Sequence, residues 1–160
     1  MLRVPRQVLV YLFQRRHDGD LEFLMLRRTV ERGGFWQGVS GAPDWHESDD
    51  EGAIREVQEE TGFAIAGNLQ QIGFRYVLLR AGDSDEEQWE RLYGPDVDAV
   101  PEEVYVAEVP SDTEPALAPD EHDAFRWCSF DHALALLTYE ENRRALHAAR
   151  DFLANHATRA

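Results

Sequence analysis

The stretch GAPDWHESDDEGAIREVQEETGF, residues 41–63, combines the signals for one short helix with an unusual concentration of carboxylates. Ser48 and Glu51 form a capping-box pattern, in which a serine at the N-cap is followed three positions later by a glutamate. Gly62 supplies the residue type that tolerates the left-handed conformation at a helix end. The pattern therefore predicts a helix over residues 49–61.

The predicted helix has an acidic side and an apolar side. At about 100° per residue, Glu56, Glu59 and Glu60 lie within an arc of roughly 100°, and a neighbouring face that includes Ala53 and Val57 is apolar. Like charges three and four residues apart destabilise a helix by ~0.2–0.5 kcal/mol per pair, so a compensating partner is expected. A divalent cation is one such partner, because Mg²⁺ prefers carboxylate oxygens. A solvated acidic face is the alternative.

The spacing of the other residues favours the cation. The sequence resembles the Nudix box at its strict positions, which here are Gly41, Glu47, Arg55, Glu56, Glu59, Glu60 and Gly62. Two positions depart from the usual pattern, since Ser40 stands in place of a first glycine and His46 in place of the glycine that often precedes Glu47. These departures concern the conformation of the loop and leave the carboxylates intact.

The resemblance implies an α/β protein with the Nudix fold, an α/β/α sandwich with a mixed central β-sheet. Periodicity alone predicts a single α/β or α+β domain. With 160 residues, of which 43% are hydrophobic, the chain is long enough for one domain with a substantial core. We therefore expect a single Nudix hydrolase domain over residues 1–160.

Composition limits the partners. The net charge of −15 argues against nucleic-acid binding, which requires a basic footprint. The apolar run at residues 8–13 is too short to span a membrane. A single cysteine, Cys128, agrees with a reducing compartment and suits a small buried position. We expect a cytoplasmic protein, monomer or homodimer, with no nucleic-acid or membrane partner.

Other segments predict the remaining elements. Residues 6–16 and 21–26 form a predicted hairpin, and residues 69–80 a strand with an irregularity at Gly73. In the polar excursion at residues 81–103, Ser84 and Glu87 predict a short helix that ends at Gly94, in either a lid or a solvated insertion. A strand is predicted at 104–109, a linker loop at 111–119 and helices at 130–137 and 140–156.

Two further segments resemble the dihydroneopterin triphosphate pyrophosphohydrolase branch of the Nudix superfamily. One is FWQGVSG at residues 35–41, and the other is the pair Asn142 and Arg143 near the start of the last helix. Trp36 in the first segment is either a core residue or a wall of the substrate site. The resemblance also places substrate contacts at Arg3, Arg28, Ser40 and Tyr139.

The catalytic group is assigned by resemblance. Glu56, Glu59, Glu60 and Glu121 are the expected metal ligands, and Glu59, Glu60, Glu121 and Arg55 the expected catalytic residues. Glu121 precedes His122 and a predicted strand with Trp127, and is either a ligand or the general base. Arg55 is expected to orient the carboxylates by ion pairing, with Glu47 as its candidate partner.

The predicted function is a Mg²⁺-dependent pyrophosphohydrolase, with Mn²⁺ as a substitute, that cleaves a nucleotide or pterin triphosphate to a monophosphate and pyrophosphate. The substrate is dihydroneopterin triphosphate or a dATP-type purine triphosphate. Diadenosine polyphosphates and house-cleaning nucleotides are the alternatives within the family. A Nudix-fold nucleotide sensor without turnover is the alternative from another class, which the intact set of carboxylates disfavours.

Overall fold

The computed structural model describes residues 1–80 and 86–156. Its strands are β1 (Gln7–Arg15), β2 (Leu21–Arg28), β3 (Trp36–Gln37), β4 (Val39–Gly41), β5 (Leu69–Leu79), β6 (Ala99–Glu108) and β7 (His122–Cys128). Its helices are α1 (Asp49–Thr61), α2 (Glu86–Tyr93), α3 (Phe130–Leu136), α4 (Glu140–His156) and the 3₁₀ helix η1 (Val30–Arg32). The strand order is β3-β2-β1-β6-β5, with β4 paired to β1 and β7 paired to β2. The sheet is mixed, because β1 and β6 run parallel whereas the other pairs are antiparallel.

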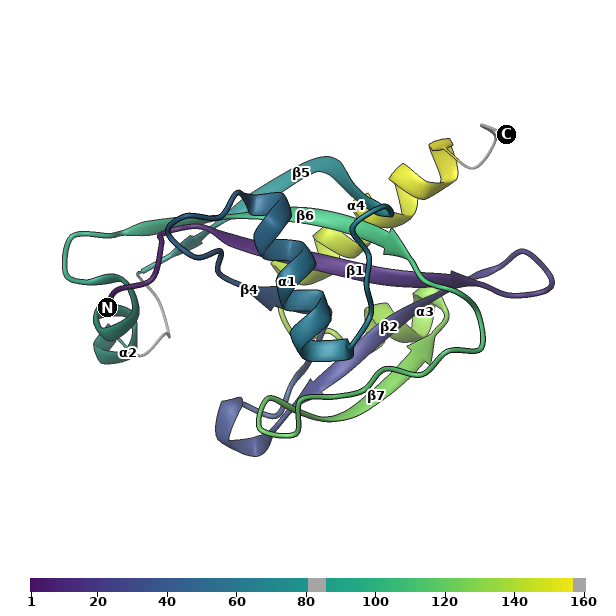
Figure 1. Cartoon of the computed structure of the whole chain (residues 1–160), viewed down its shortest axis with the longest axis horizontal. Helices are drawn as coiled ribbons and strands as arrows, with labels where there is room; N and C mark the ends of the chain where they lie inside the picture. Colours follow the sequence, from purple (N-terminus) through teal and green to yellow (C-terminus); the bar gives the residue numbers. More distant parts are fainter. Residues whose placement is uncertain (81–85, 157–160) are drawn as a thin grey trace.

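Helices cover both faces of this sheet (Figure 1). Alternate residues of β1 belong to two separate cores, because successive side chains of a strand point to opposite faces. Val8 and Val10 pack in the cluster that contains Val57 of α1, whereas Leu9 packs in the cluster that contains Leu146 of α4. The chain thus forms the α/β/α sandwich that the sequence analysis predicted.

Most predicted elements are present. The hairpin is confirmed by the antiparallel pairing of β1 with β2, and the helices at 49–61 and 140–156 have the predicted bounds. Gly73 has a φ of +74°, and the register of β5 against β6 shifts between Gln71 and Arg75. The strand predicted at 104–109 begins earlier, at Ala99, and Cys128 is buried as expected.

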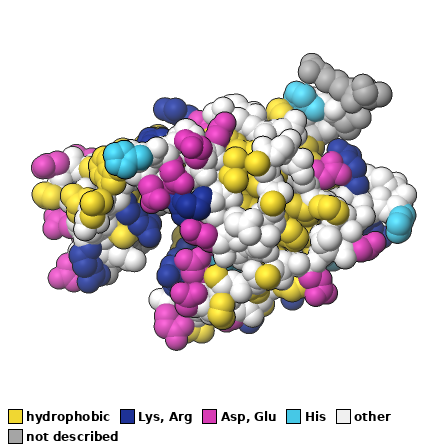
Figure 2. All heavy atoms as spheres, viewed as in Figure 1, with side chains coloured by type: hydrophobic (Ala, Val, Ile, Leu, Met, Phe, Trp, Pro, Cys, Tyr) yellow, Lys and Arg dark blue, Asp and Glu magenta, His cyan; other side chains and the backbone are white. Residues whose placement is uncertain are grey.

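The described part of the polar excursion supports the N-terminal segment. The helix predicted to end at Gly94 is α2, while Ser84, its predicted cap, lies outside the described residues. The amide of Arg3 donates to the carbonyl of Leu92 at 2.6 Å, and Gln7 Nε2 donates to the Tyr93 hydroxyl at 2.7 Å. In Figure 2 the surface is hollowed beside the region of the N-terminus and α2, with basic and acidic side chains along the hollow. Helix α2 thus binds the N-terminal segment that carries Arg3.

Among the described residues, no helix combines the length and the apolar character needed to cross a membrane.

Candidate active site

Helix α1 is fixed at both ends by the contacts that its sequence predicts. The Ser48 hydroxyl accepts from the Glu51 amide at 3.1 Å, and the Glu51 carboxylate accepts from the Ser48 amide at 3.0 Å. Gly62 ends the helix with a φ of +79°. The capping box and the glycine stop therefore set the bounds of α1 through contacts between residues that are close in the sequence.

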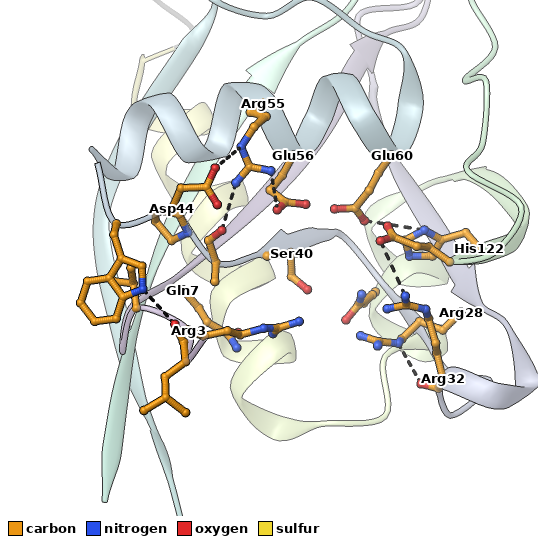
Figure 3. Close-up of a pocket in the computed structure, with 18 of the residues that line it drawn as sticks. Arg3, Gln7, Arg28, Arg32, Ser40, Asp44, Arg55, Glu56, Glu60 and His122 are labelled. Carbon is orange, nitrogen blue, oxygen red and sulfur yellow. Dashed lines mark hydrogen bonds and ion pairs between the residues drawn. The ribbon is translucent and has the colours of Figure 1, made fainter. Parts of the chain in front are cut away.

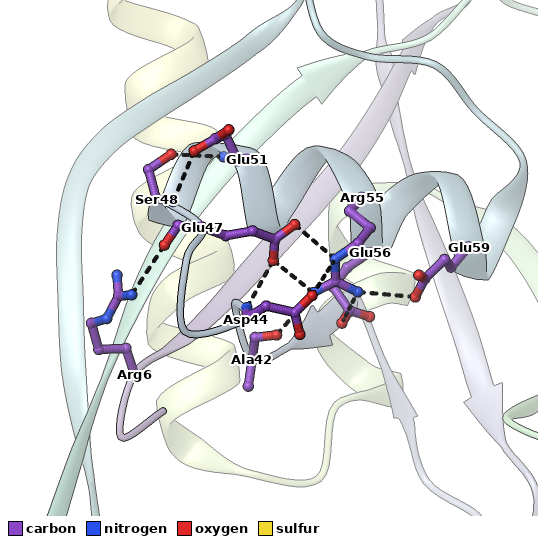
Figure 4. Close-up of polar contacts among 9 residues, drawn as sticks. All are labelled: Arg6, Ala42, Asp44, Glu47, Ser48, Glu51, Arg55, Glu56 and Glu59. Atoms are coloured by element: carbon purple, nitrogen blue, oxygen red, sulfur yellow. Dashed lines mark hydrogen bonds and ion pairs between the residues drawn. The ribbon is translucent and has the colours of Figure 1, made fainter. Parts of the chain in front are cut away.

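Arg55 is the hub of an ion-pair network on this helix (Figure 4). Its guanidinium donates to both carboxylate oxygens of Glu47, at 2.9 and 3.0 Å, and to the Ala42 carbonyl at 3.1 Å. It also donates to Glu56 and Glu59, at 3.1 Å each. These contacts, led by the hydrogen bonds to Glu47, raise the pKa of Arg55. The predicted pairing of Arg55 with Glu47 is therefore present, and it positions Glu56.

Gly41 is required by the closeness of Glu56 rather than by its own backbone dihedrals, since its φ is not positive. A Cβ at this position would lie 2.3 Å from Cδ and 2.6 Å from Oε1 of Glu56. The backbone of β4 and the carboxylate of α1 therefore meet directly, and only a glycine leaves the space.

A cavity of about 410 Å³ opens beside this contact. Figure 3 shows Glu56 and Glu60 directed from α1 toward the space that Arg3 and Arg28 approach from the other side. The lining side chains include three main kinds, besides the polar side chains of Gln7, Gln37, Ser40 and His122. The carboxylates include Glu56, Glu60 and Glu121; the guanidinium groups include Arg3, Arg28 and Arg32; and the apolar group is Met1, Leu2, Val4, Pro43 and Trp45.

Glu60 is the most deeply placed carboxylate of the cavity. Its relative exposure is 1%, and neither oxygen has a hydrogen-bond partner among the described residues. Burial raises its pKa to about 10, and the neighbouring Glu56 and Glu121 act in the same direction, while Arg28 opposes them. A buried carboxylate without partners is costly, and a bound cation would remove that cost. These orphaned oxygens therefore fit a metal ligand.

His122, at the start of β7, is a second buried polar group that the sequence analysis did not assign. It is 2% exposed, and both ring nitrogens lack a hydrogen-bond partner among the described residues. Its Nδ1 lies 3.6 Å from Oε1 of Glu60. Burial, aided by Arg28 and Arg32, lowers its pKa to about 4. The sequence signal was present, because an imidazole directly followed the predicted ligand Glu121 at the start of a strand.

Glu60, Glu121 and His122 together form a group whose ligand atoms all lie within 4.8 Å of one another. The Glu121 carboxylate also lies 3.9 Å from Arg32. The structure thus brings two of the predicted ligands, which are far apart in the sequence, to one point of the cavity.

Other predicted site residues divide into two groups. Arg3, Arg28 and Ser40 line the cavity together with Arg55. Glu59 does not, because its side chain, 57% exposed, turns outward along the helix to Arg55.

The two aromatic residues predicted as substrate contacts also lie outside the cavity. Trp36 packs against the α4-side core, with the guanidinium carbons of Arg27 and Arg126 at 5.8 and 5.2 Å from its ring centroid. Tyr139 packs edge-on against Phe35 with 5.1 Å between ring centroids. The core position of Trp36 is therefore the one that the structure shows.

The aromatic residue of the cavity is Trp45, which the sequence analysis did not select. Its Nε1 donates to the Leu2 carbonyl at 2.8 Å, while 53% of the residue is exposed. This bond joins the loop before α1 to the N-terminal segment. The indole is thus held in place at the edge of the cavity with part of its surface free.

Asn142 and Arg143 have structural contacts instead of cavity contacts. Asn142 Nδ2 donates to the Tyr76 hydroxyl at 3.0 Å, and its carbonyl accepts from Tyr11 at 2.7 Å. Arg143 donates to the Leu134 carbonyl at 2.8 Å, which ties α4 to α3. This pair therefore joins α4 to the sheet and to α3.

The model of the NUDIX domain family matches residues 3–149. An octanoyltransferase from Myxococcus xanthus is 32% identical over 130 residues, which are 81% of this chain and 32% of that protein, so the chain spans about a third of that relative's length. A bis(5'-nucleosyl)-tetraphosphatase (asymmetrical) from Rattus norvegicus is 30% identical over 146 residues, which cover 91% of this chain and 89% of that protein.

Among solved structures, the E. coli dihydroneopterin triphosphate pyrophosphohydrolase superposes with a TM-score of 0.75. The match covers 97% of this chain and 99% of that one, at 23% sequence identity. At that identity the likeness concerns the fold.

Proposed function

Because the chain belongs to the NUDIX family of hydrolases, we propose that it is a Mg²⁺-dependent pyrophosphohydrolase that cleaves a nucleoside-triphosphate-like substrate to a monophosphate and pyrophosphate. The substrate in this proposal is dihydroneopterin triphosphate or a dATP-type purine triphosphate. The observation that carries it is the composition of one cavity, which is lined by carboxylates that include the buried Glu60, by four arginines and by a half-exposed indole. The whole of residues 1–160 is proposed to act as one domain.

The carboxylates supply the cation site of this proposal. Glu56, Glu60 and Glu121 would hold the metal, and the two unpartnered oxygens of Glu60 support this assignment. A bound divalent cation neutralises charge on nonbridging phosphate oxygens and polarises the attacking water. Arg55 acts indirectly by fixing Glu56 through its 3.1 Å hydrogen bond, and Glu59 joins in the same network from outside the cavity.

The arginines supply the phosphate site. Arg28 donates through Nε to the Arg32 carbonyl at 2.9 Å, which leaves its terminal nitrogens for other acceptors. Burial and the adjacent Arg32 charge lower the pKa of Arg28, so an anionic ligand would stabilise this pair. Arg3 approaches from the N-terminal segment, and Ser40 adds a hydroxyl. A triphosphate chain suits this set, because guanidinium groups bind phosphate oxygens in pairs.

Trp45 supplies the wall for the ring of the substrate. Its indole nitrogen is already bound to Leu2, so its orientation is set before a ligand arrives. Stacking of a fused bicyclic ring on this surface would favour pterin and purine substrates over pyrimidines. In this proposal Trp45, and not Trp36, forms the wall against which the substrate ring packs.

A diadenosine polyphosphate is the second candidate substrate, and the 30% identity with the rat tetraphosphatase favours it. Such a substrate carries two nucleosides. Trp45 is the one Trp, Tyr or Phe residue among the described residues that line the cavity, so a second ring finds no aromatic partner there. This feature supports a substrate with a single ring system. A nucleotide sensor without turnover is disfavoured, because Glu56 and Glu60 both point into the cavity (Figure 3).

The test is a substrate panel with the purified protein and Mg²⁺ in ¹⁸O-water. Dihydroneopterin triphosphate, dATP, dCTP, diadenosine tetraphosphate and ADP-ribose are compared by kcat/KM, and products are identified by mass. We expect a purine or pterin triphosphate to be preferred, with pyrophosphate as the inorganic product and the isotope in the monophosphate. Orthophosphate as the main initial product, or a clear preference for diadenosine tetraphosphate or ADP-ribose, would refute the proposed substrate class.

Variants at Trp45 test the ring site. Trp45→Phe keeps an aromatic ring and loses the bond to Leu2, whereas Trp45→Ala loses both. We expect Trp45→Ala to lower kcat/KM about tenfold or more for the preferred triphosphate, since aromatic stacking on a base contributes about 1–3 kcal/mol. The loss for inorganic triphosphate, which has no ring, should be small. Equal losses for both compounds would show that Trp45 does not contact a ring.

A further inference from the structure

His122 is a buried imidazole without a hydrogen-bonding role among the described residues. Neither Nδ1 nor Nε2 has a partner, although the residue is 2% exposed. A buried polar group that loses its hydrogen bonds costs about 1–3 kcal/mol. The same holds for the adjacent Glu60, both of whose oxygens are unpartnered. Two neighbouring orphaned groups indicate one missing partner that both can bind.

The spacing of these groups identifies the kind of partner. His122 Nδ1 and Glu60 Oε1 are 3.6 Å apart, which is too far for a hydrogen bond and longer than a closed ion pair of about 2.8 Å. Two ligands on a common metal ion, each with a bond of about 2.0–2.2 Å, are separated by roughly 3–4.4 Å. The donor atoms of Glu60, Glu121 and His122 lie within 4.8 Å of one another, so a small inward adjustment would place all three around one ion.

We propose that His122 is a nitrogen ligand of a cation position shared with Glu60 and Glu121, and that this position takes Mn²⁺, Co²⁺ or Zn²⁺ in preference to Mg²⁺. The proposal rests on the proposed function in one respect, the use of Glu60 and Glu121 as cation ligands. The new proposal adds His122 to the ligands and changes the preferred metal ion. Imidazole binds borderline metals such as Zn²⁺ well, whereas Mg²⁺ prefers oxygen and retains its water.

The proposed cation position at His122 is distinct from the place where Glu56 meets Gly41. Glu56 is held by Arg55 at 3.1 Å, on the side of the cavity toward Ala42, whereas His122 enters from β7. Glu60 lies between the two in Figure 3, with His122 on one side and Glu56 on the other. One carboxylate can therefore serve an oxygen-rich position beside Glu56 and a nitrogen-bearing position beside His122.

Pulsed electron paramagnetic resonance of bound Mn²⁺ tests the proposal directly, because it detects magnetic coupling to a ligand nitrogen. The full chain is freed of metal with EDTA, dialysed and loaded with Mn²⁺ alone. We expect nitrogen coupling in the wild type, with a pattern that changes when the protein is produced with ¹⁵N-labelled histidine. This labelling experiment requires no mutation, so it decides the question even if a variant fails to fold.

Variants assign the nitrogen to one residue. His122→Asn and His122→Gln should abolish the coupling and weaken Mn²⁺ binding at least about tenfold, since even outer partners of a metal site contribute that much. Mg²⁺ affinity should change less than about threefold, because Mg²⁺ prefers oxygen ligands. His46→Gln is the matched control, since His46 is exposed and does not line the cavity. It should retain both the coupling and the Mn²⁺ affinity.

The outcomes separate this proposal from the proposed function. Bound Mn²⁺ without histidine coupling, in a protein that still hydrolyses a triphosphate, would overturn the His122 assignment and leave the function standing. Wild-type protein that binds neither Mn²⁺ nor Mg²⁺ would overturn both. Histidine coupling in a protein without triphosphatase activity would support His122 as a ligand and refute the function.

Discussion

Gly41→Ala should disable the carboxylate cluster without changing any charged residue. The added Cβ would lie 2.3 Å from Cδ of Glu56, where ordinary contact begins at 3.4 Å. The obstructing atoms belong to a side chain, so Glu56 must turn away while β4 keeps its pairing with β1. The displaced carboxylate would leave both Arg55 and the cavity.

The size of the effect follows from the contacts that Glu56 would lose. Its 3.1 Å bond to Arg55 is charged and partly buried, and such bonds contribute about 1.5–3 kcal/mol. We expect the free energy of unfolding of the metal-free protein to fall by about 2 kcal/mol. For a domain of this size that lowers Tm by roughly 4–8 °C. Loss of a metal ligand should reduce kcat/KM about 100-fold, equivalent to ~2.7 kcal/mol.

The assay is a double-mutant cycle with unfolding, Mg²⁺ titration and kcat/KM measured on each protein. Glu56→Ala removes the side chain that the new Cβ would meet, so Gly41→Ala should cost much less stability in that background. Gly67→Ala is the control, because a Cβ there meets nothing within 4 Å and the residue has no positive φ. It should change stability by less than about 0.5 kcal/mol.

Two results would refute this reasoning. One is a Gly41→Ala protein with wild-type Mg²⁺ affinity and turnover, which would show that Glu56 does not need its observed position. The other is an equal stability cost of Gly41→Ala with and without the Glu56 side chain, which would mean that the clash lies elsewhere.

Three further predictions follow from the buried groups. Glu60→Gln should lower turnover about 100-fold, and a normal turnover would remove its metal role. Burial raises the pKa of Glu60, which favours the neutral form in the metal-free protein, so the free energy of unfolding in urea at pH 7 should change little without metal. Mg²⁺ at ten times its Kd should add ~1.4 kcal/mol to the free energy of unfolding, and superimposed melting curves in EDTA and in Mg²⁺ would argue against a cation site. Burial raises the pKa of Glu102 from 4.5 to about 7 against the hydrogen bond from Tyr76, which lowers it. The folded state therefore keeps a proton on Glu102 that the unfolded state releases above pH 4.5. The contribution of this proton to the free energy of unfolding should fall by up to ~1.4 kcal/mol per pH unit as pH rises from 4.5 to 7. Glu102→Gln should flatten this dependence on pH, and equal slopes for the wild type and the variant in EDTA would contradict the assignment.

The sequence by itself determined the elements whose signals are local. The bounds of α1 follow from Ser48, Glu51 and Gly62, which act within a few residues of the helix ends. Helical periodicity placed Glu56 and Glu60 on one side, and both line the cavity. The pairing of Arg55 with Glu47 was expected from the resemblance to the Nudix box, and the structure contains it.

Periodicity failed where side-chain direction mattered. Glu59 belongs to the same arc of the helix as Glu56 and Glu60, yet its side chain turns outward and bonds to Arg55. The arc gives the direction of the Cβ atom only. The final position of a long carboxylate depends on the cations that surround it.

Only the tertiary structure decided which aromatic residue and which histidine reach the cavity. Trp36 was selected because it lies in the FWQGVSG segment, but it packs against the core on the α4 side. Trp45 borders the cavity because its indole bonds to Leu2, 43 residues away. Likewise, His122 on β7 meets Glu60 on α1 only because β7 pairs with β2 at the edge of the same sheet. Contacts between distant segments depend on how strands and helices pack, which short-range residue patterns do not encode.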